Sequence, residues 1–401
     1  MKTQIKHKPL PFRLEVAQAS LDDLMRRLAQ TRWPDEAPDQ SAEKHWRYGT
    51  PLHWLRPLQQ YWLNRFDWRL QEAQLNAFEQ WTLNLDPVDL HFIHVKGDSA
   101  KPKPLLLLHG WPGSVFEFFE LIPKLTRSLP RSDNQASIDA NLPSSSSFDV
   151  IAPSLPGFGL SFRKAQTRLG LEAMADLLHG LMHDVLGYTK YYIQGGDWGS
   201  FIASAIAYRH PAAVEGIHLN FLPLRRDTML FSDPMDQEEK RYANELDHFL
   251  KENAGYQAIQ GTRPQTLAYA LNDSPIGLAA WIGEKFAAWS DCDGSPETAI
   301  PMDRILANIS FYWFTEAIGS SFWPYYARLH TPWFIPQGDT ISVPTGYCQF
   351  PKEILKPPRS LASRTYRQII RWHEAERGGH FAALEQADTL AREIRLSFDR
   401  V

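Results

Sequence analysis

The chain has few cysteines, little net charge and no long apolar run. Its two cysteines, Cys292 and Cys348, match neither a metal site nor a disulfide framework, so we expect a reducing, cytoplasmic compartment. A formal net charge of −4 gives no reason to expect a nucleic-acid partner. Residues 1–14 are basic but lack the apolar stretch of a signal peptide. The sequence contains no run of about 18 apolar residues, so no membrane span is predicted.

Aromatic residues are abundant instead. They make up 12% of the chain and include 14 tryptophans, which is more than a core strictly requires. The excess suits a large apolar pocket, although aromatic packing between domains explains it equally well. The length of 401 residues suits about two or three structural units rather than one compact domain.

The periodicity of the apolar residues divides the chain into four segments. Strands that alternate with helices predict a mostly parallel sheet covered on both faces, with a helical block inserted before the last strands. The segments are an N-terminal region of mainly helix and loop (1–87), the first part of an α/β core (88–222), a helical lid (223–330) and the second part of the core (331–401).

Short apolar runs mark the strands within these segments. Residues 104–108, Pro-Leu-Leu-Leu-Leu, are typical of a buried parallel strand. The other predicted strands are 88–95, 149–153, 190–194, 214–219, 332–336 and 366–372, and the predicted helices include 21–28, 117–125, 171–186, 276–289 and 382–398. A serine-rich stretch near 130–147 is expected to be a surface insertion.

The most informative motif is at residues 194–200, Gln-Gly-Gly-Asp-Trp-Gly-Ser, between a strand-like and a helix-like run. A strand, a sharp glycine-flanked turn and a helix form the nucleophile elbow of α/β-hydrolases, whose usual sequence motif is Gly-x-Ser-x-Gly. Here the central residue is Asp197. A carboxylate can displace a leaving group at an sp³ carbon and form an alkyl ester, whereas a serine would indicate acyl transfer.

Two further glycine-rich turns fit the same layout. Residues 109–113, His-Gly-Trp-Pro-Gly, follow the 104–108 strand, where α/β-hydrolases supply one backbone N–H of the oxyanion hole. The residue after the nucleophile supplies the other, so the candidate donors are the amides of Trp111 and Trp198. His380 ends the last predicted strand, where the catalytic histidine of this layout lies.

The carboxylate that orients His380 has two candidates. Asp339 lies just past the predicted strand 332–336, and Glu353 follows in the run Phe-Pro-Lys-Glu. Either carboxylate could fix the imidazole tautomer and stabilise its charged form. Local sequence does not separate the two.

A leaving ether oxygen needs a proton, because an alkoxide is a poor leaving group. A general acid above Asp197 would have to come from the lid. Tyr256 follows a glycine there, and Tyr325 and Tyr326 follow a Ser-Ser pair. The pattern alone does not distinguish them from packed aromatics.

Taken together, the motifs resemble the microsomal type of epoxide hydrolase within the α/β-hydrolase superfamily, over nearly the whole chain. Runs at 109–114, 195–200 and 378–383 match the oxyanion, nucleophile and histidine motifs of this family. The lid run 271–281 also looks like the family, and the runs at 31–34, 46–49 and 66–69 are similar to its N-terminal meander. Membrane-anchored members carry an N-terminal apolar helix that this sequence lacks.

The resemblance implies the roles that the residues left open. The family places its acid in a Phe-Pro-x-Glu or Phe-Pro-x-Asp context, which favours Glu353 over Asp339. Its ring-opening tyrosines carry over to Tyr256 and Tyr325, with Tyr326 as the alternative register. The implied reaction is cofactor-free and metal-free hydrolysis of a small apolar epoxide to a vicinal diol, and a homodimer is left open.

Two other functions compete with this interpretation. A haloalkane dehalogenase also uses an elbow aspartate followed by tryptophan, but it releases halide and needs no acid. A non-catalytic hydrolase-fold protein would bind an apolar ligand without turnover. The lid tyrosines and the N-terminal region argue against the first, and the full set of nucleophile, base, acid and donors argues against the second.

Overall fold

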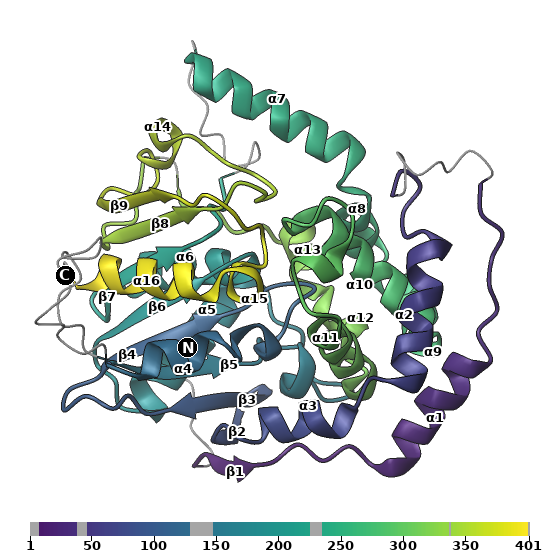
Figure 1. The fold of residues 1–401 in the computed structure, drawn as a ribbon. Coiled ribbons are helices and arrows are strands. Elements are labelled where there is room, and N and C mark those ends of the chain that lie inside the picture. The colour runs from purple at the N-terminus through teal and green to yellow at the C-terminus, as the bar shows by residue number, and fades with distance from the viewer. Residues whose placement is uncertain (1–7, 38–45, 129–146, 225–234, 337, 400–401) are drawn as a thin grey trace, which may run out of the picture.

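The computed structural model describes residues 8–37, 46–128, 147–224, 235–336 and 338–399 (Figure 1). The serine-rich stretch near 130–147 lies, apart from Ser147, outside these residues. Within the described part, nine strands form one sheet in the order β1-β2-β3-β5-β4-β6-β7-β8-β9. Strands β1, β2, β3 and β5 pair antiparallel in turn, and the strands from β5 through β4 to β9 run parallel. The predicted mostly parallel α/β sheet is confirmed.

The strands are β1 (Leu10–Phe12), β2 (Gln80–Leu85), β3 (Val88–Val95), β4 (Lys103–Leu108), β5 (Phe148–Pro153), β6 (Tyr191–Gly195), β7 (Val214–Leu219), β8 (Thr345–Gln349) and β9 (Ile369–Glu374). The helices before β7 are α1 (Gln18–Ala29), α2 (Leu52–Asn64), α3 (Trp68–Leu75), η2 (Val115–Phe118), α4 (Leu121–Thr126), η3 (Gly159–Ser161), α5 (Leu171–Gly180), η4 (Leu181–Val185) and α6 (Trp198–Arg209).

The later helices are α7 (Gln237–Glu252), α8 (Gly255–Thr262), α9 (Pro264–Asp273), α10 (Pro275–Trp289), η6 (Pro296–Thr298), α11 (Met302–Thr315), α12 (Ile318–Ser321), α13 (Trp323–His330), α14 (Arg359–Ala362), α15 (Ala382–Glu385) and α16 (Ala387–Phe398). We call the helical block α7 to α13, which lies between β7 and β8, the cap. Figure 1 shows most of the cap beside the sheet, with α7 extending away from it.

The apolar sequence of β4 fits its position at the centre of the sheet. Leu105 to Leu108 are at most 1% exposed, because β5 and β6 flank the strand and helices cover both faces of the sheet. Helix α16 packs on α4 and β8, and α6 packs on α5, β4 and β6. A continuous apolar run such as this one is characteristic of a strand buried on both faces.

The sheet differs from the prediction at both ends of the chain. Residues 332–336 form no strand, because the prolines at 332 and 336 have no backbone N–H for a ladder, and β8 pairs with β7 instead. The strand predicted at 366–372 is shifted to Ile369–Glu374. The N-terminal region contributes β1 and β2, although it was expected to be mainly helix and loop, because β2 pairs with β3 as a hairpin across Asp86–Pro87.

Three predicted helices are divided in the structure. The 117–125 segment forms η2 and α4, and the closing helix breaks at Gln386, whose φ and ψ are −140° and 50°. The helix predicted at 171–186 is α5 followed by a π-helical turn. These breaks matter for the site, because η2 and α15 both begin directly after loops that carry candidate residues.

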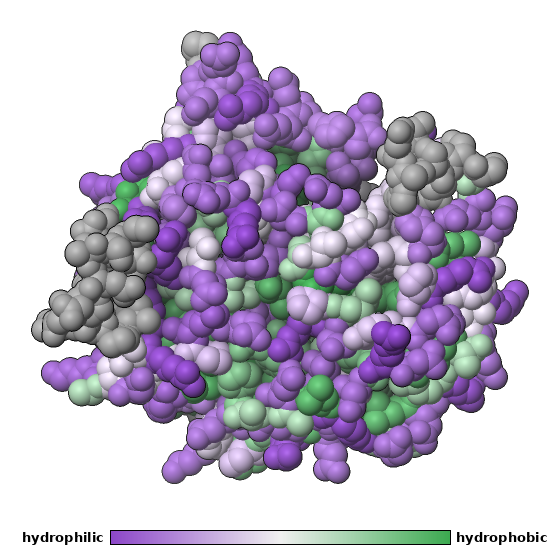
Figure 2. All heavy atoms as spheres, in the orientation of Figure 1, coloured by the Kyte–Doolittle hydropathy of each residue, from purple (hydrophilic) through white to green (hydrophobic). Residues whose placement is uncertain are grey.

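The N-terminal helices pack on the cap. Trp54 of α2 is 6% exposed and lies against Gly283 of α10, where a Cβ would clash with the indole. Its Nε1 donates to Glu297 at 3.0 Å, and Thr50 donates to the Ala280 carbonyl at 2.6 Å. Helix α2 therefore docks on the cap of the same chain. Figure 2 shows that the outer face seen there is mainly hydrophilic, with apolar residues visible in its hollows.

We expect Trp54→Ala to destabilise the protein by about 3–5 kcal/mol, because it removes a buried indole and leaves a cavity between α2 and α10. Tyr269→Ala on α9 is the matched control, since Tyr269 is 71% exposed and its loss should change stability by about 0.5 kcal/mol or less. Urea unfolding of both variants measures the difference. Equal midpoints for the two would contradict this account of the α2–α10 contact.

Candidate active site

Asp197 lies at the elbow between β6 and α6 in a backbone conformation that non-glycine residues rarely adopt. Its φ and ψ are 45° and −126°. Neighbouring glycines make the turn fit: a Cβ on Gly195 would clash with the Gly199 carbonyl, and one on Gly199 with the Leu108 carbonyl. A conformation of this kind costs about 1–3 kcal/mol and persists only where the surrounding structure enforces it. The motif therefore forms the sharp turn that its glycines predict.

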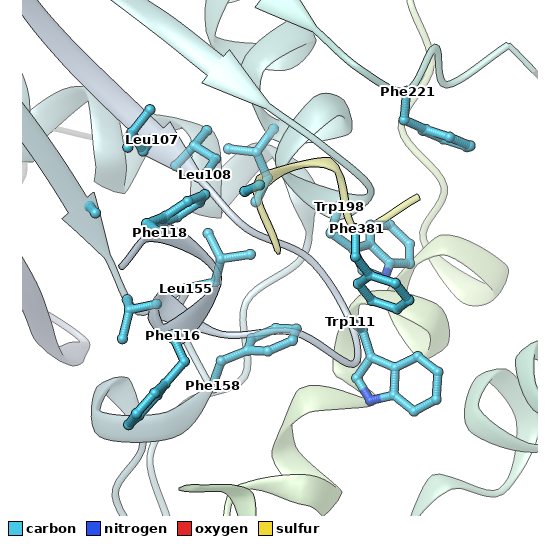
Figure 3. Packing of buried hydrophobic residues seen from close by; sticks show 14 of the residues in the cluster. Leu107, Leu108, Trp111, Phe116, Phe118, Leu155, Phe158, Trp198, Phe221 and Phe381 are labelled. Atoms are coloured by element: carbon cyan, nitrogen blue, oxygen red, sulfur yellow. The ribbon is translucent and has the colours of Figure 1, made fainter. Parts of the chain in front are cut away.

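The loop after β4 reaches the Asp197 carboxylate. The amide of Trp111 donates to Oδ1 of Asp197 at 2.7 Å, and a Cβ on Gly110 would clash with the same oxygen. Figure 3 shows Trp111 at the end of this loop, away from Leu107 and Leu108 of the strand. Trp198 begins α6, so its amide is among the first N–H groups of the helix, which have no carbonyl partner within it.

Helix α11 of the cap holds the Trp111 loop. Asn308 donates from Nδ2 to the Pro112 carbonyl at 2.7 Å and accepts at Oδ1 from the Ser114 hydroxyl at 2.7 Å. Tyr312 donates to the Gly113 carbonyl at 2.7 Å. Sequence reasoning did not identify either residue. For Asn308, the available signal was a polar amide side chain within the largely apolar run 305–311 of α11.

His380 follows β9 and is held between two carboxylates. Its Nδ1 is 2.6 Å from Oε1 of Glu353, and its Nε2 is 3.5 Å from Oδ2 of Asp197. A parallel bridge between Lys352 and Gly379 brings Glu353 alongside, and the His380 amide donates to the Trp289 carbonyl at 2.8 Å. The loops that follow β8 and β9, together with the cap, therefore fix the imidazole.

The two carboxylates change the acidity of His380. Burial alone would lower its pKa, but Glu353 and Asp197 outweigh burial and raise the pKa well above its usual value. The imidazole is consequently charged at neutral pH while Asp197 is ionised. Asp339 is not part of this arrangement, because its exposed carboxylate accepts the Tyr208 hydroxyl at 2.6 Å.

A cavity of about 340 Å³ opens between Asp197 and the cap. Tyr256 at the start of α8 and Tyr325 on α13 line it, 5% and 7% exposed, with ring centroids 5.7 Å apart. Tyr256 stacks on Trp111 at 5.4 Å, and Tyr325 meets Trp198 edge-on at 4.9 Å. The remaining lining is largely apolar, including Phe201, Phe221, Phe249, Leu250, Ile354 and Leu355.

The two adjacent tyrosines of α13 face different surroundings. Tyr325 lines the cavity, whereas Tyr326 stacks on Trp323 at 4.7 Å and on His330 at 3.9 Å. Burial, followed by the proximity of Tyr256 and Asp197, raises the pKa of Tyr325 well above its usual value. Its phenol therefore keeps the proton that a hydrogen-bond donor requires.

The described residues contain no group of three or more His, Cys, Asp or Glu side chains arranged to hold a metal ion. Among the helices of the described ranges, none has the length and apolar character needed to cross a membrane.

Comparison with known proteins assigns the family. Residues 9–118 match the model of the epoxide hydrolase N terminus, and residues 103–263 match that of the alpha/beta hydrolase fold. The chain is 35% identical over 410 residues to epoxide hydrolase 1 of Oryctolagus cuniculus, covering 96% of this chain and 87% of the relative. It is 31% identical over 407 residues to the juvenile hormone epoxide hydrolase of Bombyx mori, covering 96% and 85%.

Solved structures agree with these relatives. The epoxide hydrolase of Aspergillus niger superposes with a TM-score of 0.82 at 29% identity, covering 99% of this chain and 97% of that one. The Bombyx mori juvenile hormone epoxide hydrolase superposes with a TM-score of 0.81 at 29% identity, covering 100% and 95%. The chain thus has an α/β-hydrolase fold with an epoxide hydrolase N-terminal region. It belongs to the epoxide hydrolase family and is an enzyme.

We expect Asp197→Asn to lower the pKa of His380, because the substitution removes one of the two anions that favour the imidazolium. An ester on Asp197 would remove the same charge. Asp176→Asn is the matched control, since Asp176 contacts His210 at 2.8 Å and should leave His380 unchanged. NMR titration of the histidine rings measures both, and an unchanged His380 pKa in Asp197→Asn would contradict the electrostatic account.

Proposed function

We propose that the enzyme hydrolyses small apolar epoxides to vicinal diols through a covalent ester on Asp197. The observation that carries this proposal is the position of the Asp197 carboxylate. The Trp111 amide binds one of its oxygens at 2.7 Å, and the carboxylate lines the cavity that Tyr256 and Tyr325 also line. Nucleophile and hydrogen-bond donors thus meet in one largely apolar space.

In the first step the epoxide lies in this cavity with its ring oxygen toward the two tyrosines. The Trp111 amide holds Oδ1 of Asp197, so the other oxygen, Oδ2, attacks a ring carbon. The C–O bond of the ring breaks, and the leaving oxygen takes a proton from Tyr256 or Tyr325. General acid catalysis of this kind contributes about 10²–10⁴-fold.

In the second step His380 takes a proton from water, which attacks the ester carbonyl carbon of Asp197. Glu353 holds the imidazole through Nδ1 at 2.6 Å and stabilises its charged form. Negative charge develops on the oxygen that the Trp111 amide already binds. The Trp198 amide is the second donor, and each donor in such a site contributes about 3–4 kcal/mol.

A haloalkane dehalogenase reaction fits this site less well. Halide is a good leaving group and requires no proton, whereas two buried phenols here line the cavity with the nucleophile. The apolar lining also suits a substrate without charge. Assays of diol formation from styrene oxide and of halide release from chloro- and bromoalkanes distinguish the two activities.

We expect Tyr256→Phe or Tyr325→Phe alone to slow ester formation by about 10–1000-fold, because one donor remains for the leaving oxygen. The double variant should be nearly inactive toward styrene oxide, and it should still fold because phenylalanine keeps the ring packing. Tyr326→Phe is the matched control on the same helix and should be close to wild type. A double variant that forms ester at the wild-type rate would refute the role of the tyrosines, and halide release by it would favour the dehalogenase.

A further inference from the structure

Asp197 lines two cavities. The larger one is lined by Tyr256 and Tyr325 of the cap, and a smaller one is lined instead by residues at the strand ends, such as Leu108 and Gln194. The smaller cavity, which we call the inner cavity, offers about 20 Å³ to the centre of a water molecule. One buried water itself occupies about 10–15 Å³ and needs two to four polar partners. The inner cavity therefore has room for one water.

Polar groups surround the inner cavity. His380 and Asp197 open onto it together with Glu117, which the reaction as described does not use. The remaining lining is Leu108, Gly110, Trp111, Phe118, Gln194, Gly196, Asn220, Phe381, Ala382, Ala383 and Leu390. A water in this space would have a base, a carboxyl group and the reacting carboxylate within the same small volume.

The local structure holds Glu117 close to the nucleophile. Ser114 caps η2, and the side chain of Glu117 folds back over Gly113, where a Cβ would clash with its Oε1. Asn308 and Tyr312 of the cap hold the same turn through Ser114 and Gly113. The carboxyl group is thus fixed by the loop that also supplies the Trp111 amide.

The charge state of Glu117 suits a hydrogen-bonding role. Burial raises its pKa to about 8, the positive charge of His380 lowers it, and the negative charge of Asp197 raises it further. At neutral pH the group is therefore mainly an uncharged carboxyl. Its carbonyl oxygen can accept a hydrogen bond from water without adding a second anion beside Asp197.

We propose that the inner cavity binds the water that hydrolyses the Asp197 ester, and that Glu117 is the residue that positions this water against His380. The inference rests on the covalent reaction proposed above. In the ester the alkyl group fills the larger cavity, so water reaches the carbonyl carbon from the inner cavity. His380 lines the inner cavity, whereas the two tyrosines line the larger one.

The step balances with the groups present. Water gives one proton to Nε2 of His380, and its second O–H donates to Glu117 while its oxygen bonds to the ester carbon. The tetrahedral oxyanion collapses and breaks the bond to the alkyl oxygen, which takes the proton back from His380 and leaves as the diol. The proton remaining on the Asp197 carboxyl replaces the one that a tyrosine gave to the ring oxygen.

Ester formation and ester hydrolysis are measured separately. The reaction with styrene oxide is quenched rapidly, and the mass of the intact protein shows how much ester it carries. Glu117→Leu should form ester within about twofold of wild type, yet hydrolyse it about 100-fold more slowly, because a misplaced water loses about that factor. The ester should accumulate. Glu117→Gln keeps the shape and the acceptor oxygen, so its hydrolysis should fall by less than about tenfold. Glu117→Asp moves the carboxyl group away from the water, so this variant should hydrolyse the ester more slowly than Glu117→Gln.

Glu120→Gln is the control, because Glu120 is exposed in the same stretch of chain and contacts Arg304. Wild-type hydrolysis in Glu117→Leu, or an equal loss in both steps, would overturn the proposal. If Glu117→Leu does not fold, the order of Glu117→Gln and Glu117→Asp decides. Failure of the covalent reaction itself is distinguishable, since no ester would then appear in any variant, including His380→Gln.

Discussion

The hydrogen bond from the Trp111 amide to the Asp197 carboxylate is the contact on which the rest of the site depends. It joins the loop after β4 to the elbow after β6, two strands that are neighbours in the sheet. The elbow holds Asp197 at a φ of 45°, and glycines on both sides give the backbone the space this requires. The central strands β4 and β6, which are buried at the ends that carry this loop and this elbow, supply the rigidity that maintains the strained turn.

The cap contributes to both faces of this carboxylate. Its tyrosines border the larger cavity, and its helix α11 fixes the Trp111 loop through Asn308 and Tyr312. The N-terminal helices press on the cap from outside through contacts such as that of Trp54 with α10. The cap and the loop after β4 therefore converge on this side chain from distant parts of the sequence, and the N-terminal helices support the cap. The negative charge of Asp197 raises the pKa of both His380 and Glu117, so a change in that charge alters the acidity of both groups.

The sequence predicted much of this arrangement where the signal is local. A buried strand, a glycine-rich turn and a helix follow one another around Asp197 and Trp111, so both motifs were recognisable. The structure brings Glu353, rather than Asp339, to His380, and turns Tyr325, rather than Tyr326, toward the cavity. The resemblance to epoxide hydrolases favoured the same residues, whereas periodicity alone had left each pair open.

Features that depend on distant partners could not be predicted in this way. The 332–336 run is apolar, but its prolines cannot pair, and the less apolar Thr345–Gln349 becomes β8 because β7 and β9 lie on either side of it. Asn308 acts across 196 positions of sequence on Pro112, which no local pattern reveals. Glu117 resembled an ordinary helix residue, and its position beside Asp197 follows only from the way its side chain folds back over Gly113.

The most direct measurement is a single turnover of styrene oxide in ¹⁸O-water with enzyme in excess. The account predicts that the first diol released carries no label, because its new oxygen comes from the Asp197 carboxylate. The label should enter that carboxylate and be detected by mass spectrometry in the peptide that contains the elbow. Label in the first-turnover diol, with none in Asp197, would mean that water attacks the epoxide directly and would contradict the covalent reaction.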